Sequence, residues 1–394
     1  MRAIRQVLLL CVVVTATQWP RSGEAAGLLW TQCANVPANK QWQAIACSAD
    51  GAKLVAASWG GGIYTSSDSG QTWASNNIAP QNYWCVASSA DGTKLAATVS
   101  GSPGASIWAS KNSGTNWYRT GAATGGWQNY MGIASSADGT KLAATGAYAP
   151  NRYVYFSSDG GTNWNPTDAP TARSWYYITC SEDGTKLLGV AWNYPSNFTS
   201  IDSGATWISH PVPTNYWYAA TSSADGSKLT EVAQSGAVFT STNAGATWFS
   251  NCVPNETWNA ATSSADGTTI AIAGYGALYT SFDSGQTWVS NDIPVLAWVG
   301  IASSADGRKI IAVAYTGEIY TATPAPPILG VSLSSTNLTL TWSATATNYS
   351  LQQTKDFIHG LWTDVTNAAS KQNGQQQVTL IPKTNQVFYR LKGN

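Results

Sequence analysis

The chain has 394 residues and a formal net charge of zero, and only 10% of its residues are Asp, Glu, Lys or Arg. This composition excludes the basic surface that nucleic-acid binding requires, and it supplies no charge for attachment to a membrane surface. Twenty Trp and 18 Tyr, together with 36 Gly, favour a rigid all-β protein. At this length, one large repeat domain or two domains are expected.

The first 26 residues have the pattern of an export signal peptide. Arg2 and Arg5 precede an apolar run at residues 7–14, which is too short to span a membrane, and Gly23 and Ala25 offer the small residues of a cleavage site. We therefore expect a secreted protein of bacterial type, extracellular or periplasmic, without a transmembrane segment. Five cysteines follow the signal, so at least one is unpaired, and their spacing indicates no zinc site.

A Ser-Ala-Asp-Gly motif or a near copy occurs seven times along residues 28–322. Its Asp residues are separated by 41, 47, 45, 42, 41 and 40 residues, and they are Asp50, Asp91, Asp138, Asp183, Asp225, Asp266 and Asp306. Asp-Gly pairs favour tight hairpin turns, so each copy predicts a turn between two strands, A and B. Two further short strands, C and D, complete each repeat. Repeats of this length are typical of propellers.

A second turn, between strands C and D, recurs in six repeats with the pattern Ser-x-Asp-x-Gly-x-x-Trp. It occupies residues 66–73, 110–117, 157–164, 200–207, 241–248 and 281–288. Asn112 and Asn243 replace the Asp in two copies, and Asn can form the same turn hydrogen bonds. These CD turns resemble the Asp-boxes of BNR-repeat propellers, which include sialidases, xyloglucanases, sortilin-type receptors and photosystem II assembly factors. The resemblance covers about residues 28–322 and implies a seven-bladed β-propeller.

The two ends of the repeat region predict how the ring closes. The seventh repeat lacks a CD turn, whereas residues 28–31, which include Trp30, look like an isolated strand D. We expect this N-terminal strand to complete the last blade and so remove the open sheet edges. The predicted organisation is a signal peptide at 1–26, an Asp-box propeller at 27–322, a Pro-rich linker at 323–327 and a small C-terminal β-sandwich module at 328–394. That module would serve attachment, sorting or spacing.

Few residues are candidates for catalysis. Most Asp residues lie in the two kinds of turn, and the two histidines, His210 and His359, fall in different predicted domains, which does not favour a metal cluster or a Ser/His/Asp triad. We assign no catalytic residue, metal or cofactor. The alternative is a glycoside hydrolase or polysaccharide lyase that uses carboxylates such as Glu231 or Glu318, which would require two carboxylates about 5–10 Å apart.

Aromatic residues are the candidates for ligand binding. Eight residues before each motif Asp, an aromatic residue opens strand A: Trp42, Tyr83, Tyr130, Trp175, Trp217, Trp258 and Trp298. The predicted B–C loops add Trp59, Tyr148, Trp192, Tyr194, Tyr275 and Tyr315. Strand alternation places both sets on the face opposite the turns. Packing between blades is favoured for the first set because every repeat has one, and ligand stacking is favoured for the second because loops seldom need large apolar groups.

The sequence thus predicts a monomeric, non-catalytic binding propeller that recognises a glycan or an extracellular protein through an aromatic face. A scaffold for protein assembly is the further alternative, and a flat aromatic patch without a pocket would favour it.

Overall fold

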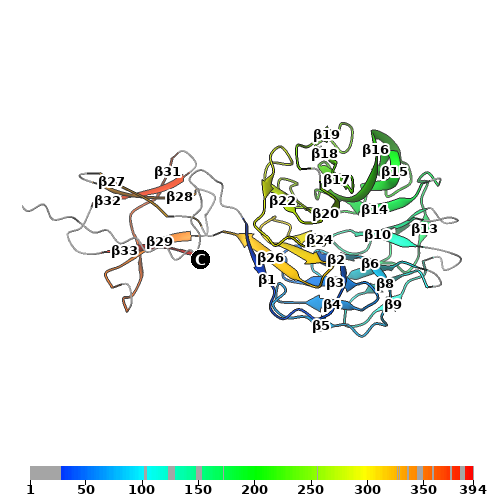
Figure 1. Ribbon diagram of the computed structural model, residues 1–394, viewed down its shortest axis with the longest axis horizontal. Helices are drawn as coiled ribbons and strands as arrows, with labels where there is room; N and C mark the ends of the chain where they lie inside the picture. Colours follow the sequence, from blue (N-terminus) through cyan, green and yellow to red (C-terminus); the bar gives the residue numbers. More distant parts are fainter. Residues whose placement is uncertain are drawn as a thin grey trace, which may run out of the picture. The chain divides into compact units, whose positions relative to one another are not determined.

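The computed structural model describes residues 28–101, 104–122, 129–147, 153–171, 173–254, 256–325, 327, 329–334, 337–343, 349–356, 359–372, 375–381 and 387–393. The expected signal peptide lies outside these residues. Two compact units are present, a large one at Leu28–Thr323 and a small one that holds the described residues from Pro324 onward (Figure 1). All regular elements of the described chain are strands. No helix long and apolar enough to cross a membrane occurs among the described residues.

Each repeat of the large unit contributes strands that pair in antiparallel order from A to D. The A strands are β2 (Trp42–Cys47), β6 (Tyr83–Ser88), β10 (Tyr130–Ser135), β14 (Trp175–Cys180), β20 (Trp258–Ser263) and β24 (Trp298–Ser303). The B strands are β3 (Leu54–Ser58), β7 (Leu95–Val99), β11 (Leu142–Gly146), β17 (Leu229–Ala233), β21 (Ile270–Gly274) and β25 (Ile310–Ala314). The C strands are β4 (Ile63–Ser66), β8 (Ser106–Ser110), β12 (Val154–Ser157), β18 (Val238–Ser241), β22 (Leu278–Ser281) and β26 (Ile319–Pro324). The D strands are β5 (Ala74–Ser75), β9 (Tyr118–Arg119), β13 (Asn165–Pro166), β19 (Phe249–Ser250) and β23 (Val289–Ser290).

Two long strands depart from this scheme. β15 (Leu187–Ser200) joins strands B and C of the fourth repeat, and β16 (Ile208–Ser222) joins strand D of that repeat to strand A of the fifth, so β14 to β19 form one six-stranded sheet. The sequence predicts a B–C loop at residues 192–197, but there β15 stays paired with β16, as at Trp192 opposite Tyr216. Continuous cross-strand pairing replaces the expected loop.

The N-terminal strand belongs to the last sheet. β1 (Leu28–Gln32) lies beside β26 in a sheet of order β1-β26-β25-β24, and the amide of Cys33 extends the pairing by donating to the Ile319 carbonyl at 2.9 Å. Segments from opposite ends of the large unit therefore share one sheet, as the isolated strand-D pattern predicts.

A closed series of backbone hydrogen bonds links the AB turns. Each participating residue precedes a motif Asp and donates its N–H to the carbonyl of its counterpart in the next repeat at 2.7–2.8 Å. The members in order are Ala49, Ala90, Ala137, Glu182, Ala224, Ala265 and Ala305, and Ala305 donates to Ala49. We call this series the amide belt. The A strands follow the same circuit, because each packs against the next and β24 packs against β2.

The acidic residues of both turns stabilise the turns themselves. In the first CD turn, Asp68 accepts hydrogen bonds from the Thr72 hydroxyl at 2.5 Å and from the Thr72 amide at 2.9 Å, and these bonds lower the pKa of Asp68 to about 2. In the first AB turn, the Ser48 hydroxyl and the Ala52 amide donate to Asp50 and likewise lower its pKa. These carboxylates hold local backbone and are not poised for acid–base chemistry.

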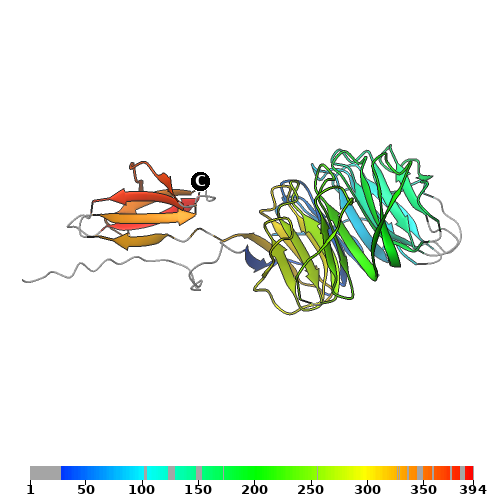
Figure 2. The ribbon, with the colours of Figure 1, turned by 90° about the horizontal axis from the view of Figure 1, so that it is seen from above.

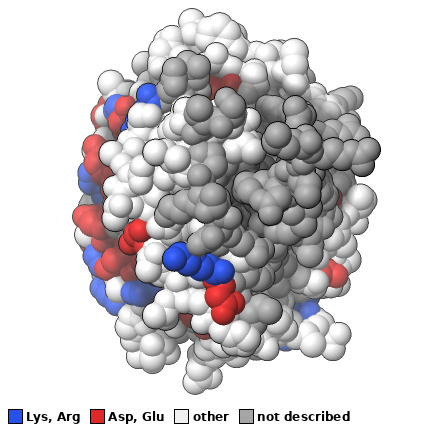
Figure 3. Space-filling model, turned by 90° about the vertical axis from the view of Figure 1, so that its left-hand side faces the viewer, with Lys and Arg blue, Asp and Glu red and all other residues white. Residues whose placement is uncertain are grey.

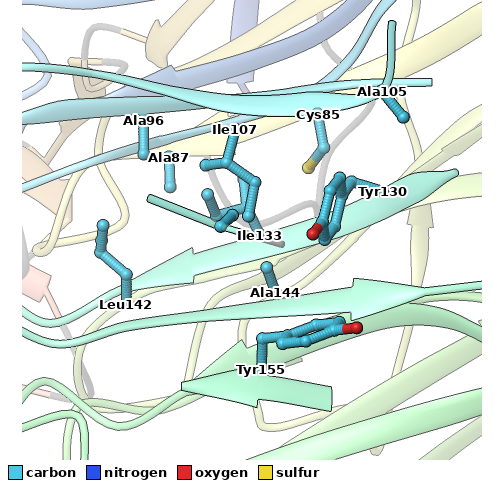
Figure 4. Packing of buried hydrophobic residues seen from close by; sticks show 11 residues of the cluster. Cys85, Ala87, Ala96, Ala105, Ile107, Tyr130, Ile133, Leu142, Ala144 and Tyr155 are labelled. Carbon is cyan, nitrogen blue, oxygen red and sulfur yellow. The ribbon is translucent and has the colours of Figure 1, made fainter. Parts of the chain in front are cut away.

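The hydrophobic core lies between successive sheets. In one interface, Ile107 of β8 and Cys85 of β6 pack with Tyr130 of β10 and Ala144 of β11, and Figure 4 shows these side chains pointing toward one another. The strand-A aromatic residue is thus a packing element of its interface.

The small unit consists of two sheets. One has the order β27 (Gly330–Leu333), β28 (Leu338–Ser343), β32 (Gln375–Leu380) and β31 (Ser370–Gln372), and the other has the order β30 (Thr363–Asp364), β29 (Tyr349–Thr354) and β33 (Phe388–Gly393) (Figure 2). Leu340, Trp342, Leu351 and Val378 form its core.

In Figure 3 most of the described surface is uncharged, and charged side chains gather toward one edge of the view.

Candidate functional site

Strand A of every repeat carries a β-bulge directly after its first aromatic residue. In β2, for example, Trp42 pairs with Ser58 and Ala44 with Ala57, so the residue between them has no cross-strand partner. The register shifts at the same place in the other six repeats. Bulges redirect side chains and are common beside functional sites. The residues that follow the aromatic, which we call the bulge residues, are Gln43, Trp84, Met131, Tyr176, Tyr218, Asn259 and Val299.

The aromatic residues that open strand A are in the core. Each is at most 1% exposed, and they are Trp42, Tyr83, Tyr130, Trp175, Trp217, Trp258 and Trp298. The indole of Trp42 meets the edge of the Tyr64 ring at 5.4 Å, and its Nε1 donates to the Gly317 carbonyl at 2.8 Å. Rings buried to this extent have no face open to a ligand. Their place in the structure fits the packing interpretation.

The other predicted aromatic residues divide into three groups. Tyr275 and Tyr315 are 53% and 39% exposed, whereas Trp59 and Trp192 are half-buried. Tyr194 stacks on Phe198, and the Arg173 guanidinium lies 3.6 Å from the centre of the Tyr194 ring, so this tyrosine takes part in local packing. Tyr148 lies outside the described residues.

Six aromatic side chains from four repeats form one continuous surface cluster. Its members, which we call the aromatic cluster, are Trp59, Trp84, Tyr176, Trp192, Tyr216 and Tyr218. Their ring centres are 5.6 Å apart for Trp59 and Trp84, and 6.2 Å apart for Trp84 and Tyr176. Tyr176 then lies 4.8 Å from Trp192 and 4.9 Å from Tyr218, and Trp192 lies 5.0 Å from Tyr216. All but Tyr216, which is 46% exposed, are half-buried.

Tyr177, the neighbour of the cluster member Tyr176, is a packing residue. The equivalent position in the other repeats holds a small residue: Ala44, Cys85, Gly132, Ala219, Ala260 and Gly300. Tyr177 packs against the hydrophobic clusters of three different interfaces, and its hydroxyl forms a hydrogen bond with the Cys85 sulfur. Burial raises the pKa of Tyr177 well above its ordinary value. This one large side chain therefore joins three interfaces of the large unit.

Side-chain amides lie at or next to strand A in the third and sixth repeats, and at the end of strand B in the fifth. The bulge residue Asn259 donates to the Trp298 carbonyl at 3.0 Å, and Gln234 approaches the Asn259 oxygen at 3.5 Å. Asn129 accepts a hydrogen bond from the Ser100 hydroxyl at 3.1 Å. Amides supply donors and acceptors without charge; of these three, Asn129 and Gln234 are half-buried and Asn259 is buried.

The carboxylates considered for hydrolysis do not form a catalytic pair. Glu231 is on strand β17, fully buried, and not in a loop. Burial raises its pKa well above the ordinary value, and its carboxyl group meets the Asn197 amide. Glu318 is half-buried and accepts a hydrogen bond from the hydroxyl of Thr316 at 2.5 Å. A carboxyl enclosed in a sheet interface cannot contact a sugar substrate, so the pair of Glu231 and Glu318 is not supported.

The five described cysteines are unpaired. Cys33, Cys47, Cys85, Cys180 and Cys252 are free thiols. Burial raises the pKa of both Cys47 and Cys180 to about 12. Over the described part of the chain, no group of three or more His, Cys, Asp and Glu side chains could hold a metal ion.

Sequence reasoning found Trp59 and Trp192 but missed Trp84, Tyr176, Tyr216 and Tyr218. A signal for Trp84, Tyr176 and Tyr218 exists in the repeats. The position eight residues before the motif Asp is always aromatic, which indicates packing, whereas the next residue varies among Gln, Trp, Met, Tyr, Asn and Val. Variation at a fixed place in a repeat indicates that the shared packing does not dictate the side chain, although Met131 and Asn259 at this place are buried.

No protein-family model matches the sequence, and no curated protein does. Among solved structures, the chain is similar to YCF48 from Cyanidioschyzon merolae, with a TM-score of 0.57 and 16% identity, covering 75% of this chain and 98% of that one. It is also similar to a structure of YCF48 bound to D1 peptide, with a TM-score of 0.58 and 14% identity, covering 75% of this chain and 96% of that one. At these identities the likeness concerns the fold. Together with the repeated four-stranded antiparallel sheets, it shows that this chain has a β-propeller fold.

Proposed function

We propose that the chain is a protein-binding propeller that recognises a segment of a partner protein at its aromatic cluster. One observation carries the proposal: aromatic side chains from four repeats, including the bulge residues of three of them, form a single partly exposed cluster. Aromatic residues dominate the binding energy of protein interfaces.

The proposed propeller has seven blades and belongs to the Asp-box type. The closed circuit of seven residues in the amide belt supports this number of blades. The Asp-box assignment is supported by the CD turns. In all six copies the Ser hydroxyl donates to the Asp or Asn side chain and accepts from the Gly amide.

The remaining organisation is proposed as the sequence predicts it. The chain would be exported through a signal peptide at 1–26, with a propeller at 27–322, a linker at 323–327 and a β-sandwich module at 328–394. The two compact units and the two small sheets are compatible with these boundaries.

A protein ligand suits the cluster better than a glycan. Sugars stack on open, flat ring faces, but here Trp59 meets Trp84 at an interplanar angle of 77°, and Trp84 meets Tyr176 at 88°. The rings thus cover part of each other's faces and present edges and gaps, which suit apolar side chains. A neighbour of the same fold, YCF48, was solved with a peptide bound.

The test is selection of a phage-displayed library of 12-residue peptides against the full chain. Peptides selected on the wild-type protein should lose about tenfold or more in affinity for Trp84→Ala and for Trp192→Ala, because truncating a central aromatic removes a dominant contact. Phe282→Ala is the matched control, since Phe282 is an exposed ring of a CD turn. Thermal melting verifies that each variant is folded.

Two outcomes contradict the proposal. Peptides that bind the wild type, Trp84→Ala, Trp192→Ala and Phe282→Ala with equal affinity would place binding outside the aromatic cluster. A glycan array that retains the wild-type protein but not Trp84→Ala, when no peptide behaves in this way, would favour the glycan ligand.

A further inference from the structure

Three positions of the repeat supply the aromatic cluster. They are the residue before the buried strand-A aromatic, the bulge residue after it, and the residue nine positions after the motif Asp. Backbone hydrogen bonds tie the first and third together in every repeat, as from Trp192 to the Ser174 carbonyl at 2.9 Å and from Tyr275 to the Thr257 carbonyl at 3.1 Å. All six members of the aromatic cluster come from these positions.

None of these positions holds a charged residue in any of the seven repeats. The residues before the aromatic are Gln41, Asn82, Asn129, Ser174, Tyr216, Thr257 and Ala297. The bulge residues are Gln43, Trp84, Met131, Tyr176, Tyr218, Asn259 and Val299. The residues after strand B are Trp59, Ser100, Ala147, Trp192, Gln234, Tyr275 and Tyr315.

Three charged side chains directly precede these positions, and two of them contact aromatic rings that are not in the cluster. Lys40 lies 5.2 Å from the centre of the Tyr64 ring, and Arg173 lies over Tyr194. Glu256 directly precedes Thr257, whereas Asp168 and Asp292 lie farther from strand A in their connections. Glu318 accepts a hydrogen bond from the Thr316 hydroxyl.

A charged ligand group would be costly here. It would give up water against aromatic rings without gaining a counter-charge, and the attraction of a cation to ring faces that neighbouring rings partly cover offsets only part of this cost. Apolar and aromatic ligand side chains gain by the same burial, at about 25 cal/mol per Å² of apolar surface. Neutral amides such as Gln43 and Gln234 can pair with the peptide groups of an extended segment without discriminating between its side chains.

Resting on the proposed function, we infer that the recognised segment is uncharged and rich in apolar or aromatic side chains, and that it is held without an ionic contact. Affinity then depends on ring contacts and neutral hydrogen bonds and is nearly independent of salt.

Three synthetic peptides test the inference. The first has 12 residues of Gly, Ser and Thr with two Trp and two Leu, and its ends are acetylated and amidated to remove terminal charge. The second and third replace two Ser by Lys or by Glu. Isothermal titration with the full chain should give tightest binding for the neutral peptide and about tenfold weaker binding for both charged ones. The dissociation constant of the neutral peptide should change less than about twofold between 50 and 500 mM NaCl.

A charge placed in the site should remove the penalty for the oppositely charged peptide. Gln43→Lys should improve binding of the Glu peptide about tenfold and leave the Lys peptide weak, because it supplies the missing counter-charge. Thr115→Lys is the control, since it adds the same charge at an exposed position of a CD turn.

The outcomes separate this inference from the proposed function. If a charged peptide binds as tightly as the neutral one and loses affinity in Trp84→Ala, the inference is wrong and the binding site stands. If the neutral peptide binds with no loss in Trp84→Ala, or none of the three binds, the segment-binding proposal is itself contradicted.

Discussion

Glu231 and Asn197 are polar residues at positions where the other repeats place apolar ones. The counterparts of Glu231 are Ala56, Ala97, Ala144, Gly189, Ile272 and Ala312, and those of Asn197 are Ile63, Ile107, Val154, Val238, Leu278 and Ile319. Pairs such as Ile107 with Ala144 and Ile319 with Ala56 share a hydrophobic cluster. An apolar contact repeated around the ring is therefore replaced by a buried amide–carboxyl contact at a single interface.

This contact makes the interface sensitive to pH. Both side chains are fully buried, and Glu231 Oε1 and Asn197 Oδ1 have no hydrogen-bond partner among the described residues. The pKa of Glu231 is raised by burial from an ordinary value of 4.5, so the folded state favours its neutral form. The stability that neutral Glu231 contributes to the folded state is fully present below pH 4.5, and it is lost as the pH rises through the folded-state pKa of Glu231.

Glu231→Gln should remove this dependence, because the amide has a similar shape and cannot ionise. We expect the variant to match the wild type near pH 4 and to exceed it at pH 8 by on the order of 2 kcal/mol. Urea unfolding of both proteins across this range measures the difference. Burial also lowers the pKa of His210, which forms a hydrogen bond with Thr199 on the same strand as Asn197. Because His210 is present in both proteins, its titration contributes to both pH profiles. Parallel pH profiles would show that Glu231 is not the titrating group.

At the scale of elements, the AB turns pack tightly against one another around the ring. Gly139 has a φ of 64°, and a Cβ placed there would lie 2.7 Å from the Lys94 Cβ of the preceding repeat. Lys94 also donates its ammonium group to the Asp138 carbonyl at 2.7 Å. The glycine is thus required both by the turn and by its neighbour.

Gly139→Ala should destabilise the protein by about 1–3 kcal/mol, since alanine is strained at this φ and collides with Lys94. Gly104→Ala is the matched control, because a methyl group added there would have no described atom within 4 Å and the φ of Gly104 is not positive. Chemical denaturation of the two variants makes the comparison, and equal stabilities would contradict the packing role of the AB turn.

Elements were predictable where local signals determine them. The Asp-Gly pairs and the CD turns indicate the hairpins, and the lone Trp30 segment indicates the closing strand. The bulges were not predictable, because the unpaired residue depends on cross-strand register and no Gly or Pro marks it. Residues 192–197 have the composition of a loop, yet pairing with β16 keeps them in a strand.

At the scale of the whole molecule, β1 joins distant parts of the chain. Trp30 packs on the hydrophobic cluster of the last sheet, and its Nε1 donates to Asn291 at 3.0 Å. Trp30→Ala should therefore cost about 1–3 kcal/mol and lower the melting temperature. Leu29→Ala, at an exposed position of the same strand, should have little effect. A melting temperature unchanged by Trp30→Ala would mean that β1 does not stabilise the closure.

The repeat spacing predicts a propeller because periodicity is a property of the sequence itself. The aromatic cluster could be predicted only in part, since Trp84 and Tyr176 come from the second and fourth repeats and meet across the third. Such a contact between residues 92 positions apart depends on the curvature of the whole ring, which no single segment of the chain encodes.

The amide belt has an electrostatic consequence. In a helix, peptide dipoles point along one axis and add to a macrodipole. In the belt each N–H donates to the next carbonyl of a closed series, so the series has no first or last member. The belt therefore lacks the unpaired terminal peptide groups through which a helix end attracts charged ligands.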